Sequence, residues 1–311
     1  MPFISICIPA YQRPQYLKRL LDSIRIQSFT DFEVIITDDS PDDSVYQLFH
    51  EYSDIPSLYY HKNPRPLGTP ANWNAAIALA KGQWIKLMHD DDWFASTDAL
   101  QQFANCAKNN DGAFIFSAYT NVYEDGKKEK PFFPEKFRIN EASKEPAILL
   151  AKNFIGPPST TLYKNDGRYE YDEKLKWLVD IDMYRRRLET DKLVYLPQPL
   201  TKVYMSSSQV TAYTKNIGAI EIPEHFHFLE KMGIKKLKNI LVYDYNWRFI
   251  RNFNITKIED LRKFGYDGPV HPVITAMIIA QSKISRKLLR NGVSSKLLMS
   301  LHFIKNKHKI K

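Results

Sequence analysis

The stretch from Gln83 to Asp92, QWIKLMHDDD, joins a mostly apolar run to three consecutive aspartates. A second stretch, FEVIITDDS from Phe32 to Ser40, ends in the same way, with two aspartates after a run rich in β-branched residues. Short runs of this kind, bounded by polar residues, predict buried strands. We therefore predict two buried strands, each with a cluster of carboxylates at its carboxyl end.

Helical patterns alternate with strands of this kind through the first hundred residues. The helix predicted from about Pro14 to Gln27 places apolar side chains on one face, and Thr69 and Thr97 are predicted to cap two later helices. The predicted strands are 3–8, 32–37, 58–61, 83–88 and 113–118, and the predicted helices are 14–27, 44–52, 69–81 and 97–109. This alternation predicts an α/β fold with a mostly parallel central sheet and helices on both faces. Ligands of such sheets bind at the carboxyl ends of strands, where both acidic clusters fall.

The alternation ends after Tyr119. A hairpin is predicted around Asp125-Gly126, and residues 127–145 form a polar loop without a legible pattern. Further strands are predicted at 159–163, 193–196 and 200–204, a helix at 178–188, and helical structure from about 215. We predict a first domain at 1–212, with halves at about 1–118 and 119–212, and a helical C-terminal region at 213–311.

Composition excludes several classes of protein. The chain has 11 glycines, and no two lie closer than Gly265 and Gly268, which excludes a G-x-G-x-x-G fingerprint and a P-loop. Two cysteines exclude a disulfide framework and a Cys-rich zinc site, and they fit a reducing cytosol. The apolar runs are too short for a membrane span, and no signal-peptide pattern is present, so a cytoplasmic location is predicted.

The positive charge is concentrated in the tail. The net charge is +9, and residues 268–311 carry nine basic groups and no acidic one. Val293, Leu297, Leu298, Leu301 and Ile304 recur at helical spacing, which predicts a basic amphipathic helix. Such a helix either lies on an anionic membrane surface, where each lysine adds about 1 kcal/mol, or packs on its own domain. No nucleic-acid-binding motif or aromatic interleaving is present, so nucleic acid is not a predicted partner.

The acidic clusters indicate a site for a cation and a nucleotide. Three adjacent carboxylates repel one another, and a divalent cation such as Mn²⁺ or Mg²⁺ turns them into a site for substrate phosphates. The alternative is a solvated helix cap ahead of Thr97. The pair Asp38-Asp39 either belongs to a turn or offers a carboxylate that accepts the ring N–H of a uracil base on which Tyr11 stacks.

These segments together resemble family 2 glycosyltransferases with a GT-A fold. The resemblance covers residues 3–205 and rests on their order and spacing. The matching segments are Ile6–Arg13, Phe32–Ser40, Asn72–Asn74, Ala80–Trp84 and His89–Asp92.

The resemblance implies roles for single residues on the donor side. Pro9, Tyr11 and Asp39 would hold the nucleobase, Arg13 would approach the nucleotide, and Asp91 would lie near the ribose. Asp92 would be the main metal ligand. The family often has an aspartate where this chain has His89, and Asp90 next to it would supply that carboxylate to the metal.

The segment Trp177–Arg185 resembles the family's acceptor-site helix. Asp180 matches the catalytic base, and Asp182 matches a supporting acid. Gly156 and Ser159 lie in a loop that would approach the acceptor or donor sugar, and Trp177 would stack on a sugar face. At Val203–Gln209 many relatives carry an arginine and a histidine near the diphosphate, whereas this chain has Met205 and Ser207.

The resemblance therefore implies an inverting, metal-dependent glycosyltransferase of bacterial type that acts in polysaccharide or glycan assembly. It would move a hexose or N-acetylhexosamine from a nucleotide-diphosphate sugar, probably UDP-linked, to a glycan or polyprenyl-diphosphate-linked acceptor. The basic tail would hold it on the cytoplasmic face of the plasma membrane. Two alternatives stay open. A sugar-phosphate nucleotidyltransferase would usually have glycine in the loop Pro9–Arg13, which has none, and a non-catalytic membrane or polyanion binder would depend on the tail alone.

Overall fold

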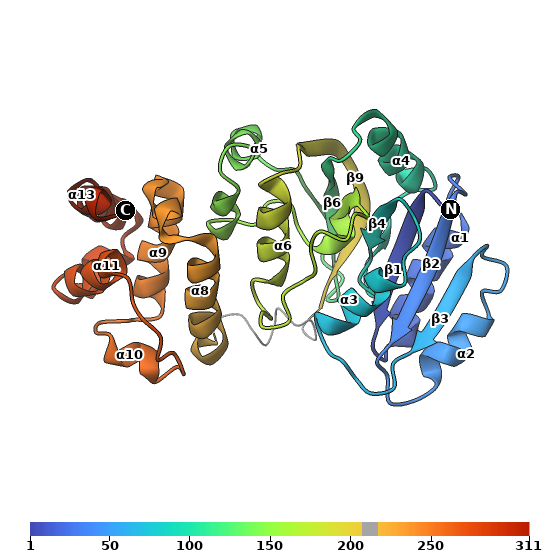
Figure 1. Ribbon diagram of the computed structural model, residues 1–311, viewed down its shortest axis with the longest axis horizontal. Helices are drawn as coiled ribbons and strands as arrows, with labels where there is room; N and C mark the ends of the chain where they lie inside the picture. Colours follow the sequence, from blue (N-terminus) through green and yellow to red (C-terminus); the bar gives the residue numbers. More distant parts are fainter. Residues whose placement is uncertain (207–216, 311) are drawn as a thin grey trace. The chain divides into compact units, whose positions relative to one another are not determined.

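The structure is a computed structural model that describes residues 1–206 and 217–310 (Figure 1). The chain divides into two compact units and crosses between them several times. Unit 1 comprises Met1–Ser143, Phe154–Glu173 and Asp182–Gln209, and unit 2 comprises Lys144–Asn153, Lys174–Ile181 and Val210–Lys311.

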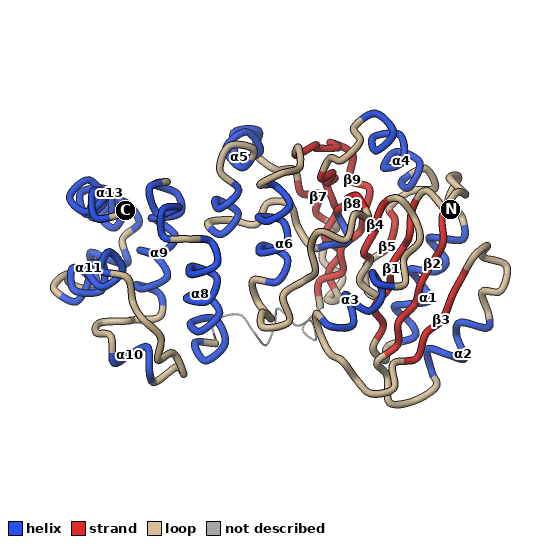
Figure 2. Tube along the Cα trace, in the orientation of Figure 1, coloured by secondary structure: helices blue, strands red, loops and turns tan. Residues whose placement is uncertain are grey.

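Unit 1 is built on a sheet whose strands follow the order β3-β2-β1-β4-β8-β6-β9-β5, with β7 paired to β6 (Figure 2). Its strands are β1 (Ile4–Ala10), β2 (Phe32–Asp38), β3 (Leu58–Lys62), β4 (Trp84–Leu87), β5 (Trp93–Phe94), β6 (Phe114–Tyr123), β7 (Lys130–Phe132), β8 (Thr161–Lys164) and β9 (Leu193–Met205). Every residue of β1, β2 and β4 is buried, as the apolar runs of these segments predicted.

The parallel strands bring the acidic clusters to one edge. β1 pairs in parallel with β2 from Ile4↔Phe32 to Ala10↔Asp38, and with β4 up to Cys7↔Leu87. The chain after each of these strands therefore leaves the sheet at the same edge, which confirms that prediction.

Helices cover both faces of this part of the sheet, as predicted. The helices of unit 1 include α1 (Pro14–Arg25), α2 (Ser44–His50), α3 (Ala71–Ala78), α4 (Ala99–Asn109) and α5 (Lys136–Ala142). Ile4, Ile6 and Ile8 belong to one core cluster with apolar residues of α1, α2 and α4. Cys7 points to the opposite face because side chains alternate along a strand, and its thiol contacts the carbonyl of Ala76 in α3.

The sheet is mixed rather than mostly parallel. β8 is antiparallel to β4 and β6, and β5 is antiparallel to β9. The two strands predicted at 193–196 and 200–204 are one strand, β9, parallel to β6. Ser117 of β6 pairs with Leu196 and Ala118 with Pro199, so the intervening residues bulge out without ending the strand.

Several predicted boundaries also differ. α3 begins at Ala71 and α4 at Ala99, so neither Thr69 nor Thr97 is a cap residue. Lys130–Phe132 pairs with Tyr119–Asn121, which confirms the hairpin. Residues 127–145, predicted as a loop, contain β7 and α5.

Unit 2 is helical in its described part, which confirms the helical C-terminal region. Its helices are α8 (Gly218–Met232), α9 (Ile240–Asn252), α10 (Glu259–Arg262), α11 (Pro272–Ser282), α12 (Arg286–Arg290) and α13 (Gly292–Asn306). Helix α6 (Val179–Leu188) has residues in both units. Short 3-10 helices are η1 (Pro146–Leu150), η2 (Pro158–Thr160), η3 (Ile234–Lys238) and η4 (Lys307–Lys309). Within residues 1–206 and 217–310, we find no helix with the length and apolar character needed to cross a bilayer.

Candidate active site

Three loops meet at the carboxyl edge of β1, β2 and β4. The Tyr11 N–H donates to Asp90 Oδ2 at 3.3 Å, which joins the loop after β1 to the acidic segment after β4. The Gln12 N–H donates to Ser40 Oγ at 2.7 Å, which joins the same loop to the segment after β2. The sequence prediction that these segments form one site therefore has a geometric basis.

The loop after β1 has an uncommon backbone. Gln12 and Arg13 both adopt the left-handed conformation, with φ of 55° and 53°, although neither is glycine. Two such residues in succession cost about 1–3 kcal/mol each. The Arg13 guanidinium lies 3.1 Å from Asp90 Oδ1 and 3.7 Å from Asp91 Oδ2, so ion pairs hold this conformation.

The acidic segment brings together three side chains of the types that bind metal ions. One donor atom each of His89, Asp91 and Asp92 lies within 4.8 Å of the other two. The N–H of Tyr204 donates to Asp92 Oδ1 at 3.0 Å. The Ser159 side chain also interacts with the Asp92 carboxylate and favours its ionised form. Asp92 Oδ2 is buried, and among the residues that the structure describes no donor meets it in ordinary hydrogen-bond geometry. His89 Nδ1 lies 4.0 Å from that oxygen, and the rings of His89 and Trp73 are 4.9 Å apart.

This set differs from the predicted pair of metal ligands, Asp90 and Asp92. The Asp90 carboxylate is held by Arg13 and by the Tyr11 N–H, and it lies outside the cluster. The sequence analysis did not consider His89 as a metal donor and placed Asp91 near the ribose, whereas both lie in the cluster with Asp92.

Burial shifts the pKa values of this segment toward the neutral forms. Burial, with the nearby charge of Asp91, raises the pKa of Asp90 to about 7 and that of Asp92 well above its usual range. Burial lowers the pKa of His89. A positive charge beside this segment would favour the ionised carboxylates, and a bound cation supplies such a charge.

Two basic residues that the sequence analysis did not single out support the segment. Lys86 of β4 is fully buried, donates to the Ser159 carbonyl, and has its pKa lowered by burial to about 7. Arg19 of α1 donates to the Asp91 carbonyl at 2.9 Å and lies 3.6 Å from the Trp93 ring centroid. Lys86 could have been singled out from the sequence because it is a lysine within an otherwise apolar strand. No sequence pattern indicated a role for Arg19.

The predicted nucleobase residues surround the end of β2. Asp39 is buried, and it accepts hydrogen bonds from Asn63 Nδ2, the Leu67 N–H and the Gly68 N–H at 2.7, 3.1 and 2.8 Å. A carboxylate offers about four acceptor positions, so one remains for a ligand. Tyr11 is 50% exposed at this edge, whereas Pro9 is buried within β1. The role of these residues in base binding stays a prediction.

Asp180 lies at the start of α6. Its Oδ2 accepts from Asn153 Nδ2 at 2.8 Å, and its Oδ1 accepts from the Ile181 N–H at 2.8 Å. Burial raises the pKa of Asp180 to about 6, which suits a general base near neutral pH. Just before it, the Trp177 N–H donates to Glu224 at 2.8 Å, so α8 fixes the entry into α6.

Three residues predicted for the sugar side of the site, Ser159, Asp182 and Gly156, are all buried. Ser159 is fully buried, and its Oγ accepts from the His89 N–H at 2.9 Å, so it positions the acidic segment. Its approach to a sugar stays a prediction. Asp182 is also fully buried, and Arg186 pairs with it at 2.8 Å within α6; its role as a supporting acid stays a prediction. Gly156 is buried with φ +97°, and a Cβ there would lie 2.8 Å from the Tyr119 ring. Many relatives carry an arginine and a histidine where this chain has Met205 and Ser207. Met205 is the last residue of β9, and Ser207 lies outside the described residues.

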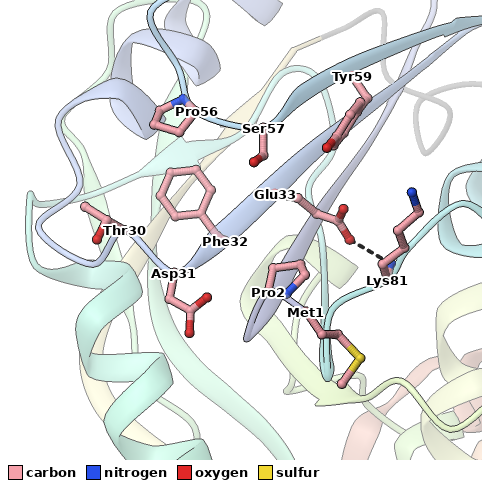
Figure 3. Close-up of a pocket in the computed structure, with 10 residues that line it drawn as sticks. All are labelled: Met1, Pro2, Thr30, Asp31, Phe32, Glu33, Pro56, Ser57, Tyr59 and Lys81. Atoms are coloured by element: carbon pink, nitrogen blue, oxygen red, sulfur yellow. Dashed lines mark hydrogen bonds between the residues drawn. The ribbon is translucent and has the colours of Figure 1, made fainter.

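A separate pocket of about 570 Å³ lies at the opposite edge of the sheet, where β1, β2 and β3 begin. Figure 3 shows its lining, including Glu33, which accepts from the Lys81 N–H at 2.6 Å. It contains none of the residues of the acidic segment.

A sequence profile described as "Glycosyl transferase family 2" matches residues 5–166, a range that contains all three loops of the site. The chain belongs to glycosyl transferase family 2.

Matches to other proteins extend beyond that range. An uncharacterized glycosyltransferase of Methanocaldococcus jannaschii is 26% identical over 300 residues, which cover 95% of this chain and 97% of the relative. Hyaluronan synthase of Pasteurella multocida is 24% identical over 266 residues, 84% of this chain. That match spans only 25% of the synthase.

Solved structures of glycosyltransferases have the same fold. TarS of S. aureus, residues 1–349 in complex with UDP-GlcNAc, aligns with a TM-score of 0.61 at 15% identity, over 99% of this chain and 92% of TarS. The mannosyltransferase PcManGT of Pyrobaculum calidifontis, in complex with GDP-Man and Mn²⁺, aligns with a TM-score of 0.51 at 12% identity, over 99% and 75% of the two chains. The predicted GT-A fold is confirmed.

Glycosyltransferases with this fold usually use a divalent cation, and the residues present fit one. Two carboxylates are the oxygen ligands that Mg²⁺ and Mn²⁺ prefer, and the imidazole adds a nitrogen donor. The observation that supports this fit is Asp92 Oδ2, which is buried without a donor in ordinary hydrogen-bond geometry among the described residues and lies 4.0 Å from His89 Nδ1. Which of the two metals binds is not specified by this donor set.

Proposed function

We propose that this chain is an inverting glycosyltransferase that moves a hexose or N-acetylhexosamine from a UDP-linked sugar to a glycan or lipid-linked glycan acceptor. The observation that carries the proposal is the juxtaposition of the His89, Asp91 and Asp92 cluster with the exposed Tyr11 ring at one sheet edge. This edge is where open α/β sheets bind their ligands. The complex of TarS with UDP-GlcNAc, a protein of the same fold, supports the choice of a UDP-sugar.

On the donor side, the proposal assigns the nucleobase to Tyr11 and Asp39, with Pro9 as part of the floor. Arg13 approaches the nucleotide, and Asp91 lies near the ribose. His89 and Asp92 hold the divalent cation, with Asp91 beside them. The cation supplies positive charge that stabilises the leaving diphosphate.

On the acceptor side, Asp180 is proposed as the base. It takes the proton of the acceptor hydroxyl while that oxygen bonds to the anomeric carbon and the bond to the diphosphate breaks. A pKa of about 6 keeps its carboxylate mostly ionised at neutral pH. The proposal also assigns to Trp177 the stacking on a sugar face, and to the loop of Gly156 the approach to the acceptor or donor sugar.

We also propose that residues 1–212 form the catalytic domain and that 213–311 are an appended helical region. The basic residues of that region hold the protein on the cytoplasmic face of the plasma membrane, where a polyprenyl-diphosphate-linked acceptor is available.

The first test is a screen of nucleotide sugars with Mn²⁺, repeated with a chelator, in which released nucleotide is measured. Release of UDP from one donor, lost with the chelator, supports the proposal. Release of pyrophosphate from a nucleoside triphosphate and a sugar phosphate would instead show a nucleotidyltransferase. No turnover of any donor with glycan acceptors would contradict the proposal.

Variants then test the two roles separately. Asp180→Asn should keep UDP binding and lose transfer by roughly 10²–10⁴-fold, and Asp54→Asn, an exposed aspartate paired with Arg25, is the matched control. Near-parental transfer by Asp180→Asn would refute its role as the base.

Metal binding is measured without turnover, by titration with Mn²⁺. His89→Gln and Asp92→Asn should weaken binding, whereas Asp90→Asn should have a smaller effect, because Asp90 pairs with Arg13. A larger effect of Asp90→Asn than of His89→Gln would favour the pair Asp90 and Asp92 predicted from the sequence. Equal Mn²⁺ affinity in all variants would remove the metal from this site.

A further inference from the structure

Helix α13 packs on unit 2 through a face that is partly polar. Ser295, Met299, His302 and Asn306 recur at intervals of three and four residues, and they face the unit. The Trp247 indole donates to Ser295 Oγ at 3.2 Å, and the Tyr243 hydroxyl and His302 Nδ1 are hydrogen-bonded at 2.8 Å. His302 Nε2 lies 3.2 Å from the Ala276 carbonyl, so both ring nitrogens fix this face of the helix.

The aliphatic stripe of α13 lies on the opposite side. Val293, Leu297, Leu301 and Ile304 are 81, 62, 57 and 63% exposed. At 100° per residue these four positions fall within an arc of about 80°, about opposite the face that packs on unit 2. Of the five apolar residues from which the amphipathic helix was predicted, only Leu298 is half-buried. The helix therefore docks on its own unit and still presents the aliphatic stripe.

The charges around the aliphatic stripe are of one sign. Lys296 and Lys305 flank it on either side of the helix, and Lys307 and Lys309 follow in η4. The last acidic residue of the sequence is Asp267. Two copies of this chain that paired through the stripe would bring like charges together, which opposes association. An anionic lipid surface matches both features, since aliphatic side chains enter the acyl boundary while lysines reach the headgroups.

We propose that α13 lies in the plane of an anionic membrane surface, with Val293, Leu297, Leu301 and Ile304 inserted and the flanking lysines at the headgroups. The occupant of the aliphatic stripe is thus lipid. The inference rests on the proposed function only for the lipid-linked acceptor in the same membrane. The contact between α13 and lipid does not depend on catalysis.

The test uses the full chain and flotation with vesicles of phosphatidylcholine, either pure or with about one third phosphatidylglycerol. The parent should float with the anionic vesicles and far less with the neutral ones. Leu297→Ser/Leu301→Ser should weaken binding to anionic vesicles by about tenfold or more. The matched control is Ile26→Ser/Leu79→Ser, which removes two exposed aliphatic side chains from unit 1 and should float like the parent.

Far-ultraviolet dichroism and thermal unfolding establish that each variant is folded. The proposal is overturned if the parent does not float with the anionic vesicles. It is equally overturned if the stripe variant, Leu297→Ser/Leu301→Ser, floats like the parent. The proposal is also overturned if the parent is a dimer and the stripe variant is a monomer with unchanged vesicle binding. Turnover with a soluble acceptor separates this inference from the proposed function: a chain that floats but never releases nucleotide contradicts only the latter.

Discussion

Replacing Asn153 by alanine should move the acidic limb of the activity–pH profile upward, because Asn153 stabilises the ionised form of the proposed base. Its amide donates to Asp180 Oδ2 at 2.8 Å, and the pKa of Asp180, raised by burial, is about 6. Activity of the parent should therefore rise through about pH 6 as Asp180 loses its proton, and level off above it.

The size of the shift follows from the hydrogen bond. A hydrogen bond to a charged group contributes about 1.5–3 kcal/mol, and 1.36 kcal/mol corresponds to one pKa unit. Water can replace part of this bond because Asp180 is only half-buried, so a shift of about one unit is expected. At about pH 6 the parent is half ionised and the variant roughly one tenth, which predicts a fivefold loss of kcat/KM.

The assay is kcat/KM for nucleotide release between about pH 5 and pH 9, with donor saturation checked at each point. Parent and Asn153→Ala should converge above about pH 8, where both bases are ionised. Asn109→Ala, in α4, is the matched control and should reproduce the parental profile. A loss of equal size at every pH, or an unmoved limb, would refute the link between Asn153 and the base.

Three further predictions concern other parts of the chain. The Glu224 carboxylate accepts hydrogen bonds from three consecutive N–H groups ahead of α6. Glu224→Ala should therefore lower kcat and leave the donor KM unchanged. A raised donor KM at constant kcat would contradict this. A Cβ at Gly82 would lie 2.6 Å from the backbone nitrogen of Ser5, so Gly82→Ala should lower the free energy of unfolding in urea by about 1–3 kcal/mol. Gly292→Ala, where no atom lies within 4 Å, is its control and should be nearly neutral. Burial lowers the pKa of His225 to about 4, whereas the unfolded chain binds this proton at about 6.5, so its contribution to stability is complete above pH 6.5 and falls by about 1.4 kcal/mol per unit below it. His225→Gln should remove that slope from the pH dependence of unfolding, and an unchanged slope would assign it to other groups.

The acidic edge of the sheet could be predicted because its signals are local. A buried strand that ends in carboxylates places them at the carboxyl end whatever surrounds the sheet, and parallel pairing then brings the ends of β1, β2 and β4 together. The position of Asp180 at the start of α6 was accessible in the same way, from the helical pattern that follows it.

The remaining details depend on packing that no local pattern records. Ser159 and Asp182 match a family pattern by position, yet neighbouring segments bury both of them completely. Arg13 reaches Asp90 across 77 residues of sequence, and no local pattern predicts this ion pair. The periodicity of α13 marked its aliphatic stripe correctly but held no information on which face would dock.

The features assigned to function share one physical property: each is unfavourable in the isolated chain. Consecutive left-handed residues at Gln12 and Arg13 strain the backbone, and burial of the Asp92 carboxylate disfavours its ionised form. The aliphatic side chains of α13 keep most of their surface in water. A nucleotide, a divalent cation and a lipid surface would relieve these three costs in turn, so binding at each place has a larger driving force than contacts alone would give. The stable core of unit 1, with every residue of β1 and β2 buried, is what allows the first two costs to persist at its edge.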